Sequence, residues 1–594
     1  MFQSFEATTS PDQGPARLAA LRGEMARLGI AAFVVPRADI HQGEYVAPRD
    51  ERLAWLTGFT GSAGFAVALA EEAAVFIDGR YTVQVRAQVD TDHFTPVDWP
   101  KTKLGPWLAE RLGDGDVVGI DPWLHTRAEV EALEKAGLTV RCVANPVDAI
   151  WEDQPEAPMG AMVPYPLEFA GESSDEKRAR IAAALSEAGQ TAAVLTLPDS
   201  ICWLLNVRGS DIERNPLAQC LGILHDTGKF TLFAAAEKVA GVMDHLGADV
   251  TVRPVEAFEP ALHTLTGQVR VDKGAAPHGV GLALEEAGIE VAWDRDPCVL
   301  PKARKTEAEL AATREAHLRD GAAMVEFLAW LDAEAPKGGL TEIDVVKKLE
   351  GFRRATNALR DISFETICGA GPHGAIVHYR VTEGTNRDVV PGGLLLVDSG
   401  GQYIDGTTDI TRTVAIGDAG DEERACFTRV LQGMIAISRV RWPKGLAGRD
   451  LDALARAPLW MAGMDYDHGT GHGVGVYLNV HEGPQRLARI SEVALEPGMI
   501  LSNEPGYYRE GAFGIRIENL IVVREAEALG DNREQMDFET LTYVPIDLSL
   551  VEVGLLSAGE RAWLNAYHAE TFAKIGPRVS DTALEWLKRA TRAI

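Results

Sequence analysis

Residues 392–417 read GGLLLVDSGGQYIDGTTDITRTVAIG, and this stretch decides the fold of the C-terminal half. It begins with an apolar run that ends at Asp398 and closes with a second run that begins at Asp409. The glycines and polar residues between the two runs are typical of a turn. The stretch therefore predicts an antiparallel hairpin that brings Asp398 and Asp409 together. Taken alone, each aspartate would be an ordinary turn carboxylate.

Three later segments, each marked by glycine, carry further candidate ligands. His472 lies in HGTGHGVG, where glycine lets the backbone take unusual angles and approach a ligand closely. Glu504 follows an apolar run in SNEPGYY, and the Pro-Gly after it forces a turn that presents the carboxylate. Glu518 lies in FGIRIENLIVV, which predicts one strand with Arg516 and Glu518 on the same face. Without the other motifs, that charged pair could equally form a salt bridge on a surface strand.

These segments together supply four carboxylates and one imidazole, and no thiolate: Asp398, Asp409, His472, Glu504 and Glu518. An oxygen-rich set of this kind suits hard or borderline divalent ions such as Mn²⁺ rather than a structural zinc site built on cysteines. Without metal ions, four clustered carboxylates would repel one another, and their desolvation would be unfavourable. The set predicts two divalent ions, with a water between them.

Three more histidines lie in or near these segments: His378 in AIVHYR, His468 in YDHGTGHG and His481 in NVHEGP. Hydrolysis of a peptide bond needs an activated water, stabilisation of the oxyanion and protonation of the departing amine. Histidines beside a metal site can serve the last two needs. Any one of them could be a core histidine, but their clustering favours a catalytic group.

The composition excludes some classes of partner. The net charge of −29 and the pI near 4.9 argue against nucleic acid and anionic membranes. The N-terminus lacks the basic start and apolar core of a signal peptide, and no apolar run approaches the roughly 20 residues of a membrane helix. Six scattered cysteines without a CxxC motif are typical of buried free thiols in a reducing compartment. We expect a cytoplasmic protein.

The N-terminal half looks duplicated. Residues 15–40 predict an amphipathic helix, an apolar strand and a short polar segment, and residues 177–201 repeat this order. Asp39 follows the first strand and Asp199 the second, 160 residues later. Helices that alternate with short apolar runs are typical of α/β domains. A chance likeness of two helix–strand units remains the alternative.

Two stretches predict domain boundaries near residues 155–165 and 298–305, and the first of them is rich in proline. EDQPEAPMGAMVPYP covers residues 152–166, and PCVLPKARK covers residues 297–305, just before a long helix. That helix opens with Thr306 and Glu309 in a capping-box pattern, Thr341 starts a second helix, and helices return after Ser557. The expected domains are 1–158 and 159–303, two related α/β domains, and 304–594, a catalytic domain of α+β type.

The catalytic half resembles the pita-bread metallopeptidases, which include methionine aminopeptidase, prolidase and aminopeptidase P. Within that family the whole chain resembles the long, three-domain aminopeptidase P. The segments that carry this likeness are GEYVAPRDERLAWLTGFTGSAG, RGSDIERNP, PHGAIVHYR, YDHGTGHGVGVYLNVHEGP and EPGYYREGAFGIRIEN. The resemblance implies two creatinase-like N-terminal α/β domains, a C-terminal pita-bread domain and a homodimer.

The resemblance also implies an activity and a ligand set. The five residues Asp398, Asp409, His472, Glu504 and Glu518 would bind two divalent ions per subunit, most simply Mn²⁺, with Co²⁺ and Zn²⁺ as alternatives. Glu504 would act as the base that deprotonates the bridging water. The reaction would release the N-terminal residue from peptides with proline second. Proline's nitrogen carries no hydrogen and its ring fixes φ, so such a bond needs a dedicated pocket.

Five further residues receive roles from the same resemblance. His378 would donate to the carbonyl oxygen of the substrate. His468, His481, Tyr508 and Arg516 would shape the proline pocket, and the three histidines join Glu504 as catalytic candidates. Tyr508 and Arg516 could equally support the metal ligands from behind.

Three alternatives remain open. A prolidase would cleave Xaa-Pro dipeptides only, but prolidases usually lack the second N-terminal domain. A non-catalytic pita-bread binding module would have lost ligands, and all five are present here. A creatinase-type enzyme works without metal and lacks the acidic set. One local feature, Asn503 before Glu504, is expected at most to tune the water or the metal.

Overall fold

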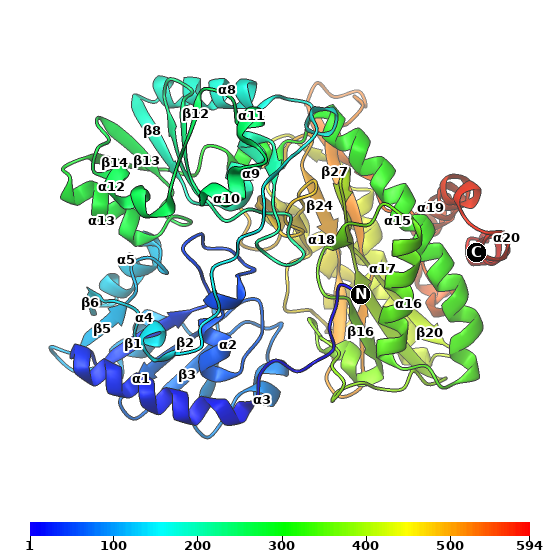
Figure 1. Cartoon of the computed structure of the whole chain (residues 1–594). Coiled ribbons are helices and arrows are strands. Elements are labelled where there is room, and N and C mark those ends of the chain that lie inside the picture. Colours follow the sequence, from blue (N-terminus) through cyan, green and yellow to red (C-terminus); the bar gives the residue numbers. More distant parts are fainter. The chain divides into compact units, whose positions relative to one another are not determined.

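The computed structural model describes all 594 residues, which form two compact units (Figure 1). One unit is Thr8–Lys302, and the other combines Met1–Ala7 with Ala303–Ile594. The expected three-domain limits, 1–158, 159–303 and 304–594, stay a prediction. No helix is both long enough and apolar enough to cross a lipid bilayer.

The unit Thr8–Lys302 contains two six-stranded mixed sheets with the same design. The first has the order β4-β3-β2-β1-β5-β6 and the second β12-β11-β10-β8-β13-β14. In each sheet two central pairs are antiparallel and the other three are parallel. The strands of the first are β1 Ala32–Pro36, β2 Phe65–Leu69, β3 Ala73–Ile77, β4 Thr95–Asp98, β5 Val117–Ile120 and β6 Thr139–Cys142. Those of the second are β8 Gln190–Leu195, β10 Leu221–His225, β11 Phe230–Phe233, β12 Val250–Arg253, β13 Gln268–Val271 and β14 Glu290–Trp293; the short β7 Val163–Pro164 pairs with β9 Val207–Arg208.

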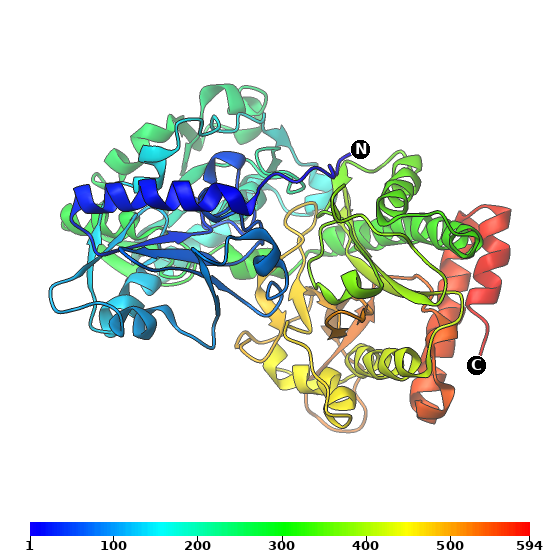
Figure 2. The same ribbon diagram turned by 90° about the horizontal axis from the view of Figure 1, so that it is seen from below.

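Helices accompany both sheets in a matching order. The first repeat has α1 Gly14–Leu28, α2 Arg52–Thr57, α3 Gln84–Gln88, α4 Leu104–Ala109, α5 Arg127–Lys135 and α6 Pro146–Ile150. The second has α7 Leu167–Ala170, α8 Ser174–Glu187, α9 Pro198–Leu205, α10 Ala236–Val239, α11 Met243–Leu246, α12 Phe258–Leu262, α13 His278–Glu286 and α14 Val299–Ala303. Figure 2 shows α1 lying along one face of its sheet, where Leu18, Leu21 and Met25 are buried. The predicted duplication is confirmed by this shared topology.

The two repeats meet in a way that reflects their symmetry. The backbone N–H of Ala128, the second residue of α5, donates to Lys273 O at 3.2 Å. The N–H of Gly279, the second residue of α13, donates to Pro122 O at 2.8 Å. Each acceptor is the second residue after the strand that precedes the other helix. Exchanging the repeats therefore exchanges the two bonds, as in a twofold-symmetric dimer interface.

The second unit is built from short sheets and six long helices. Its sheets have the orders β15-β18-β19, β16-β17-β20, β21-β28-β27-β24-β22-β23 and β25-β26. The helices are α15 Glu307–Glu334, α16 Glu342–Ala355, α17 Asp421–Ser438, α18 Gly448–Trp460, α19 Ala558–Ile575 and α20 Asp581–Ala590. The strands are β15 Asp361–Ile362, β16 Ile367–Ala370, β17 Gly393–Ser399, β18 Gly401–Tyr403, β19 Gly406–Thr407, β20 Ile410–Ile416, β21 Trp442–Pro443, β22 Gly471–Gly473, β23 Glu482–Leu487, β24 Ile500–Asn503, β25 Gly506–Arg509, β26 Phe513–Arg516, β27 Asn519–Glu525 and β28 Gln535–Thr540.

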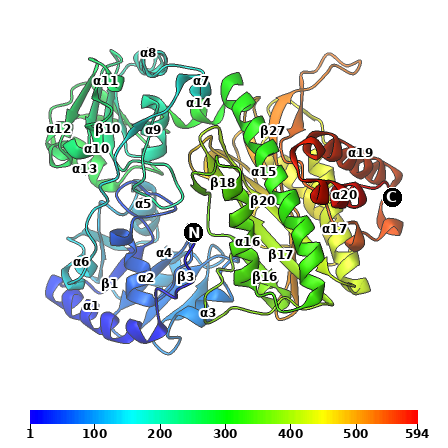
Figure 3. The same cartoon turned by 45° about the vertical axis from the view of Figure 1, so that its right-hand side comes forward.

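The main helices begin where the sequence predicts. Thr306 caps α15 and forms the expected capping box with Glu309, while Thr341 caps α16 and Ser557 caps α19. Figure 3 shows α15 and α16 side by side against β16, β17 and β20. Apolar side chains of both helices and of these strands form one buried cluster between the layers. The hairpin is thereby fixed on one side by a packed core.

The predicted hairpin is confirmed. Strands β17 and β20 pair antiparallel along their whole length, with Asp398 opposite Thr411 and Ser399 opposite Ile410. Asp409 directly precedes β20. The turn between them contains two short strands, β18 and β19, that pair with each other.

The single strand expected over residues 513–523 is wrong. The chain forms β26, which ends at Arg516, and then β27, which begins at Asn519 in a different sheet. Between them Ile517 N–H donates to Pro505 O at 3.3 Å, and Glu518 N–H donates to Thr411 O at 3.1 Å. These bonds replace ladder bonds and carry the backbone from one sheet to the next.

The N-terminal residues Met1–Ala7 belong to the second unit. Phe5 is buried in the core cluster beneath α15 and α16, and its carbonyl accepts from Glu383 N–H at 2.8 Å. Gln3 and Thr366 exchange two hydrogen bonds, at 2.8 and 3.3 Å. All six cysteines are free, as expected, but Cys142 is exposed rather than buried because it ends the edge strand β6.

Candidate metal centre

Five different backbone positions deliver the predicted ligands. Asp398 is the penultimate residue of β17, and Asp409 directly precedes the paired strand β20. His472 is the middle residue of β22, Glu504 directly follows β24, and Glu518 lies at the crossing between β26 and β27. Every ligand is thus near a strand end or a sheet junction, where a side chain can leave the regular packing of a strand.

The glycines around His472 serve close packing. A Cβ on Gly471 would lie 1.9 Å from Ser502 O, and one on Gly473 would lie 2.3 Å from Glu482 O. Neither glycine has a positive φ. Close approach to the neighbouring strands, and not unusual backbone angles, therefore requires glycine on both sides of His472.

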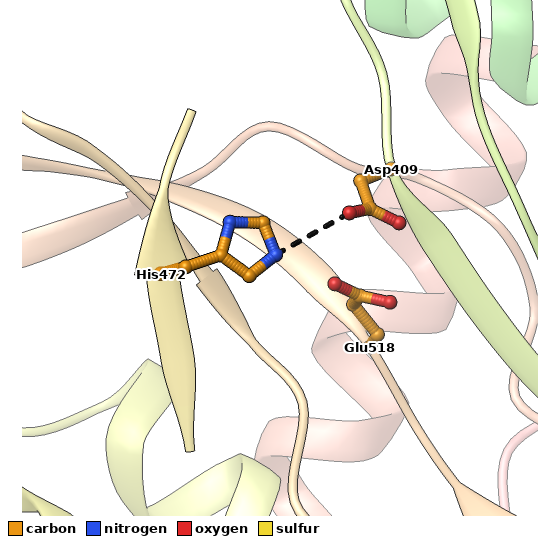
Figure 4. A group of neighbouring side chains, drawn as sticks. All are labelled: Asp409, His472 and Glu518. Carbon is orange, nitrogen blue, oxygen red and sulfur yellow. Dashed lines mark ion pairs between the residues drawn. The ribbon is translucent and has the colours of Figure 1, made fainter. Parts of the chain in front are cut away.

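The side chains converge on one point. His472 Nε2 lies 3.5 Å from Asp409 Oδ2 and 3.5 Å from Glu504 Oε1. One ligand atom from each of Asp409, His472 and Glu518 can be chosen so that all lie within 4.8 Å of one another. Figure 4 shows the two carboxylates facing the imidazole. These distances leave room for a cation between the groups.

The carboxylates are held in an environment that disfavours their charge. Burial raises the pKa of Asp409 well above its usual range, and the charges of Asp398 and Glu504 raise it further. The pKa of Glu518 is raised in the same way, first by burial and then by Asp409 and Glu504. Without a cation this cluster would be costly to ionise.

Unsatisfied oxygens point to what is needed there. Asp398 Oδ1, Asp409 Oδ1 and Glu518 Oε1 are all buried without a hydrogen-bond partner. Orphaned buried oxygens are rare in native proteins and call for an explanation such as an ion. Their carboxylate chemistry suits a divalent cation. The residues present therefore fit a metal site.

The tautomer of His472 fits the same conclusion. Its Nδ1 lies 2.9 Å from Gly473 O, which can only accept, so Nδ1 carries the hydrogen. In the neutral ring the Nε2 lone pair then faces two carboxylate oxygens. A metal ion or a proton must lie between them, and a backbone bond of this kind is the usual way to orient a metal-binding histidine.

Arg516 lies behind the ligands. It is fully buried, and its guanidinium donates to Asp398 Oδ2 at 2.6 Å, Tyr508 OH at 2.7 Å and Thr411 Oγ1 at 3.1 Å. Burial alone would lower its pKa, but Tyr508, Asp398 and nearby glutamates hold the pKa of Arg516 well above its ordinary value. Arg516 is therefore a permanent cation beside one ligand.

A chain of hydrogen bonds connects Arg516 to His468. Tyr508 OH accepts from Arg516 and lies 2.8 Å from His468 Nε2. His468 Nδ1 lies 2.8 Å from the carbonyl of Gly469, so Nδ1 is the donor and a neutral Nε2 accepts from Tyr508. Burial raises the pKa of Tyr508 to about 12, so the phenol stays protonated.

The remaining predicted histidines occupy nearby positions. The His481 ring stands edge-on to the His472 ring, with centroids 4.2 Å apart. His378 is half-buried after a short 3₁₀ helix, η5 (Gly371–Ala375), and Arg516 Nη2 lies 3.5 Å from the carbonyl of Val377. The structure thus brings His468 and His481 to the metal ligands or their supports, and it connects the backbone beside His378 to Arg516.

Sequence reasoning missed two supporting residues. Thr411 Oγ1 donates to Glu518 Oε2 at 2.8 Å. Ser502 Oγ accepts from His472 N–H at 2.9 Å and donates to Glu504 Oε1 at 3.0 Å. Each lies two residues from a ligand along the chain, so the period-two rule for strands could have found both.

Asn503 does not face the ligands. Its amide donates to Met434 O at 2.9 Å and to Ser438 Oγ at 3.0 Å, both on α17. The expected influence on water or metal is therefore not supported by its contacts. Asn503 instead fastens the end of β24 to the helix behind it.

Family models match most of the chain. Residues 311–525 match metallopeptidase family M24, and residues 534–594 match the C-terminal region of peptidase M24. Residues 17–150 and 153–309 each match a creatinase/prolidase N-terminal domain. The second pair of matches agrees with the repeated sheets.

Several known proteins are similar to this chain over nearly its whole length. A protein from Coccidioides posadasii, described as a probable Xaa-Pro aminopeptidase P, is 39% identical over 99% of this chain and 95% of its own. One of the same description from Laccaria bicolor is 39% identical over 96% and 92%. The crystal structure of X-prolyl aminopeptidase from Caenorhabditis elegans, described as a cytosolic enzyme with a di-nuclear active site, has a TM-score of 0.92 with 33% identity over 98% and 99%. An Xaa-Pro dipeptidase from Bacillus anthracis has a TM-score of 0.52 with 25% identity and covers 63% of this chain and 99% of its own.

Proposed function

This chain belongs to metallopeptidase family M24, as one of its three-domain Xaa-Pro aminopeptidases P, and we propose from that premise that it removes the N-terminal residue from peptides with proline second. Its fold is two creatinase-type N-terminal domains followed by a pita-bread catalytic domain. The observation that carries the proposal is the convergence of buried carboxylates on an imidazole whose Nε2 lone pair faces them.

We propose that Asp398, Asp409, His472, Glu504 and Glu518 hold two divalent cations. The orphaned oxygens and the raised pKa values support this set. The cations would lower the pKa of a water molecule and polarise the substrate carbonyl. Mn²⁺ is our proposed metal because the set is rich in oxygen, although Co²⁺ and Zn²⁺ suit the same ligands.

Glu504 is our proposed general base. Its side chain is 17% exposed, more than the other three carboxylates, so a water can reach it. Ser502 donates to Glu504 Oε1 and leaves Oε2 available to take a proton. The same carboxyl can then deliver that proton to the proline nitrogen, which has no hydrogen of its own and must gain one to depart.

His378 is our proposed donor to the carbonyl oxygen that becomes negative in the transition state. Groups that meet such a developing charge in place are a main source of catalysis. His468 and His481 line our proposed proline pocket beside the ligands. Tyr508 and Arg516 contribute to that pocket by fixing His468, because Arg516 donates to Tyr508 OH and Tyr508 OH contacts His468 Nε2.

The finer biological properties are also proposals. We propose a homodimer, as the family resemblance implies; the exposed apolar side chains Trp460, Met461 and Ile490, near the end of α18, support contact with a second copy. We propose a cytoplasmic location because the cysteines are free and a similar protein is described as cytosolic. Light scattering on the purified protein tests the dimer.

Cleavage assays test the activity. Metal-stripped protein is supplied with Mn²⁺ and offered an Xaa-Pro-Xaa tripeptide, an Xaa-Pro dipeptide and an Xaa-Ala-Xaa control. We expect metal-dependent release of the first residue from the proline tripeptide and not from the alanine control. Turnover of the dipeptide alone would instead identify a prolidase. If no peptide is cleaved although two metals are bound, a non-catalytic binding module would be the favoured interpretation.

A further inference from the structure

The segment that carries His378 has little regular structure of its own. It runs from the end of β16 through η5 to the residues before β17, and we call residues 370–387 the His378 segment. A donor that must meet a developing charge needs a fixed position. The contacts that provide this rigidity come from a residue outside the segment.

Glu342, the first residue of α16, is completely buried and binds the segment at several points. Its Oε1 accepts from Ala370 N–H at 2.8 Å and lies 2.9 Å from His373 Nδ1. Its Oε2 accepts from Tyr379 OH at 3.0 Å and from Arg387 N–H at 3.0 Å. One carboxylate therefore contacts both ends of the segment and a residue on each side of His378.

The donors match what a buried carboxylate requires. An ionised carboxylate offers about four lone-pair sites, and four groups reach this one. The His373 and Tyr379 rings also pack against each other, with centroids 4.4 Å apart. Glu342 also donates its own N–H to Arg387 O at 2.9 Å. The segment is closed into a loop around a single charged group.

The opposite side of η5 is held by β26. A Cβ on Gly514 would lie 1.7 Å from Gly374 O, so the two backbones are in direct contact. The same strand ends in Arg516, which contacts the metal ligand Asp398. The His378 segment is thus set between Glu342 and the strand that supports the metal ligands.

We propose that Glu342 is a positioning residue that sets the place of His378 relative to the metal centre. Only the catalytic consequence rests on the proposed function, because the contacts themselves are independent of it. Removing the carboxylate leaves several buried donors without acceptors, which frees the segment and moves His378 away from the reacting carbonyl.

Hydrogen–deuterium exchange tests the positioning directly. In Glu342→Gln an amide cannot accept from all four donors, and we expect exchange across residues 370–387 to become about tenfold faster. Tyr379→Phe removes one donor only and should shift the same residues less, and it serves if Glu342→Gln does not fold. Asp344→Asn removes a charge from the same helical turn, where Asp344 is exposed and accepts from Thr341, and should leave the segment unchanged. Equal exchange in all variants would overturn the proposal.

A double-mutant cycle tests the link to His378. We expect Glu342→Gln to lower kcat on the proline tripeptide about tenfold with little change in KM. In a protein that already carries His378→Ala, the same change should lower kcat by less than about twofold. Full additivity of the two changes would refute action through His378. If the wild-type protein cleaves no peptide, the proposed function fails, and the exchange comparison alone then decides whether Glu342 holds the segment.

Discussion

Thr411→Val should weaken metal binding although it substitutes none of the five proposed ligands. Thr411 is completely buried in β20, opposite Asp398. Its hydroxyl donates to Glu518 Oε2 at 2.8 Å and accepts from Arg516 Nε at 3.1 Å. Valine has nearly the same shape, so the change removes one hydroxyl and adds no cavity. The backbone carbonyl that accepts from Glu518 N–H is retained.

The size of the effect follows from the two lost bonds. A hydrogen bond to a charged group contributes about 1.5–3 kcal/mol, and a buried donor left unpaired costs about 1–3 kcal/mol. Glu518 loses the donor that orients its carboxylate, while Arg516 Nε loses its acceptor. Loss of a partner that orients a metal ligand typically lowers metal affinity 10–100-fold. We expect a fall in Mn²⁺ affinity in that range.

Titration calorimetry on metal-stripped protein measures the affinity, and Thr413→Val is the matched control. Thr413 lies two residues along the same strand and is equally buried. Its hydroxyl bonds the backbone of Arg516, accepting at 3.1 Å and donating at 3.0 Å, and contacts no ligand carboxylate. The control should lose folding stability but keep its Mn²⁺ affinity. Unchanged affinity in Thr411→Val, or an equal loss in both variants, would refute the reasoning.

Three further outcomes test the site. Glu504→Gln should bind an Xaa-Pro tripeptide nearly as the wild type does but lower kcat at least about 100-fold, and retained turnover would exclude the base role. His378→Ala should lower kcat about 100-fold, as expected on losing an oxyanion donor, with little change in KM; an effect on binding alone would contradict that role. Folded, metal-free protein keeps protons on Asp409 and Glu518 that the unfolded chain releases near pH 3.8 and 4.5, so its stability should fall as the pH rises above about 4. Thermal unfolding in chelator across pH 4–8 should show this decline, reduced in Glu518→Gln and reversed by Mn²⁺; identical pH slopes in the two proteins would contradict it.

The sequence could predict the hairpin because its signals are local. Two apolar runs and the turn residues between them specify β17 and β20 within 25 residues. The helix starts at Thr306, Thr341 and Ser557 are equally local, since a capping box involves residues three apart. The repeat in the N-terminal half was visible for the same reason. Patterns among residues close together in the sequence were therefore enough to predict these elements.

Two features of the catalytic unit, the break between β26 and β27 and the contacts of Glu342, could not be predicted in the same way. The break between β26 and β27 depends on bonds from Ile517 to Pro505 and from Glu518 to Thr411, the second spanning more than 100 residues. A pattern with period two continues across residues 513–523, so it favours one strand. Glu342 lies in the first turn of a helix, where an acidic residue usually stabilises the helix through its interaction with the helix dipole. Its real partners lie 28 to 45 residues away.

Charge balance favours two cations in this site over one. Four ligand carboxylates carry four negative charges when ionised, and Arg516 contacts one of them, Asp398. One divalent ion together with Arg516 leaves a net negative charge in a buried cluster, which burial penalises. Two divalent ions together with Arg516 leave one positive charge, which a bound hydroxide would neutralise. Such ions would also supply partners for the three orphaned oxygens, on Asp398, Asp409 and Glu518, as buried oxygens require. The network around Arg516 would hold Asp398 and Glu518 in place whether or not the metals are bound, so metal binding need not reorganise this part of the site.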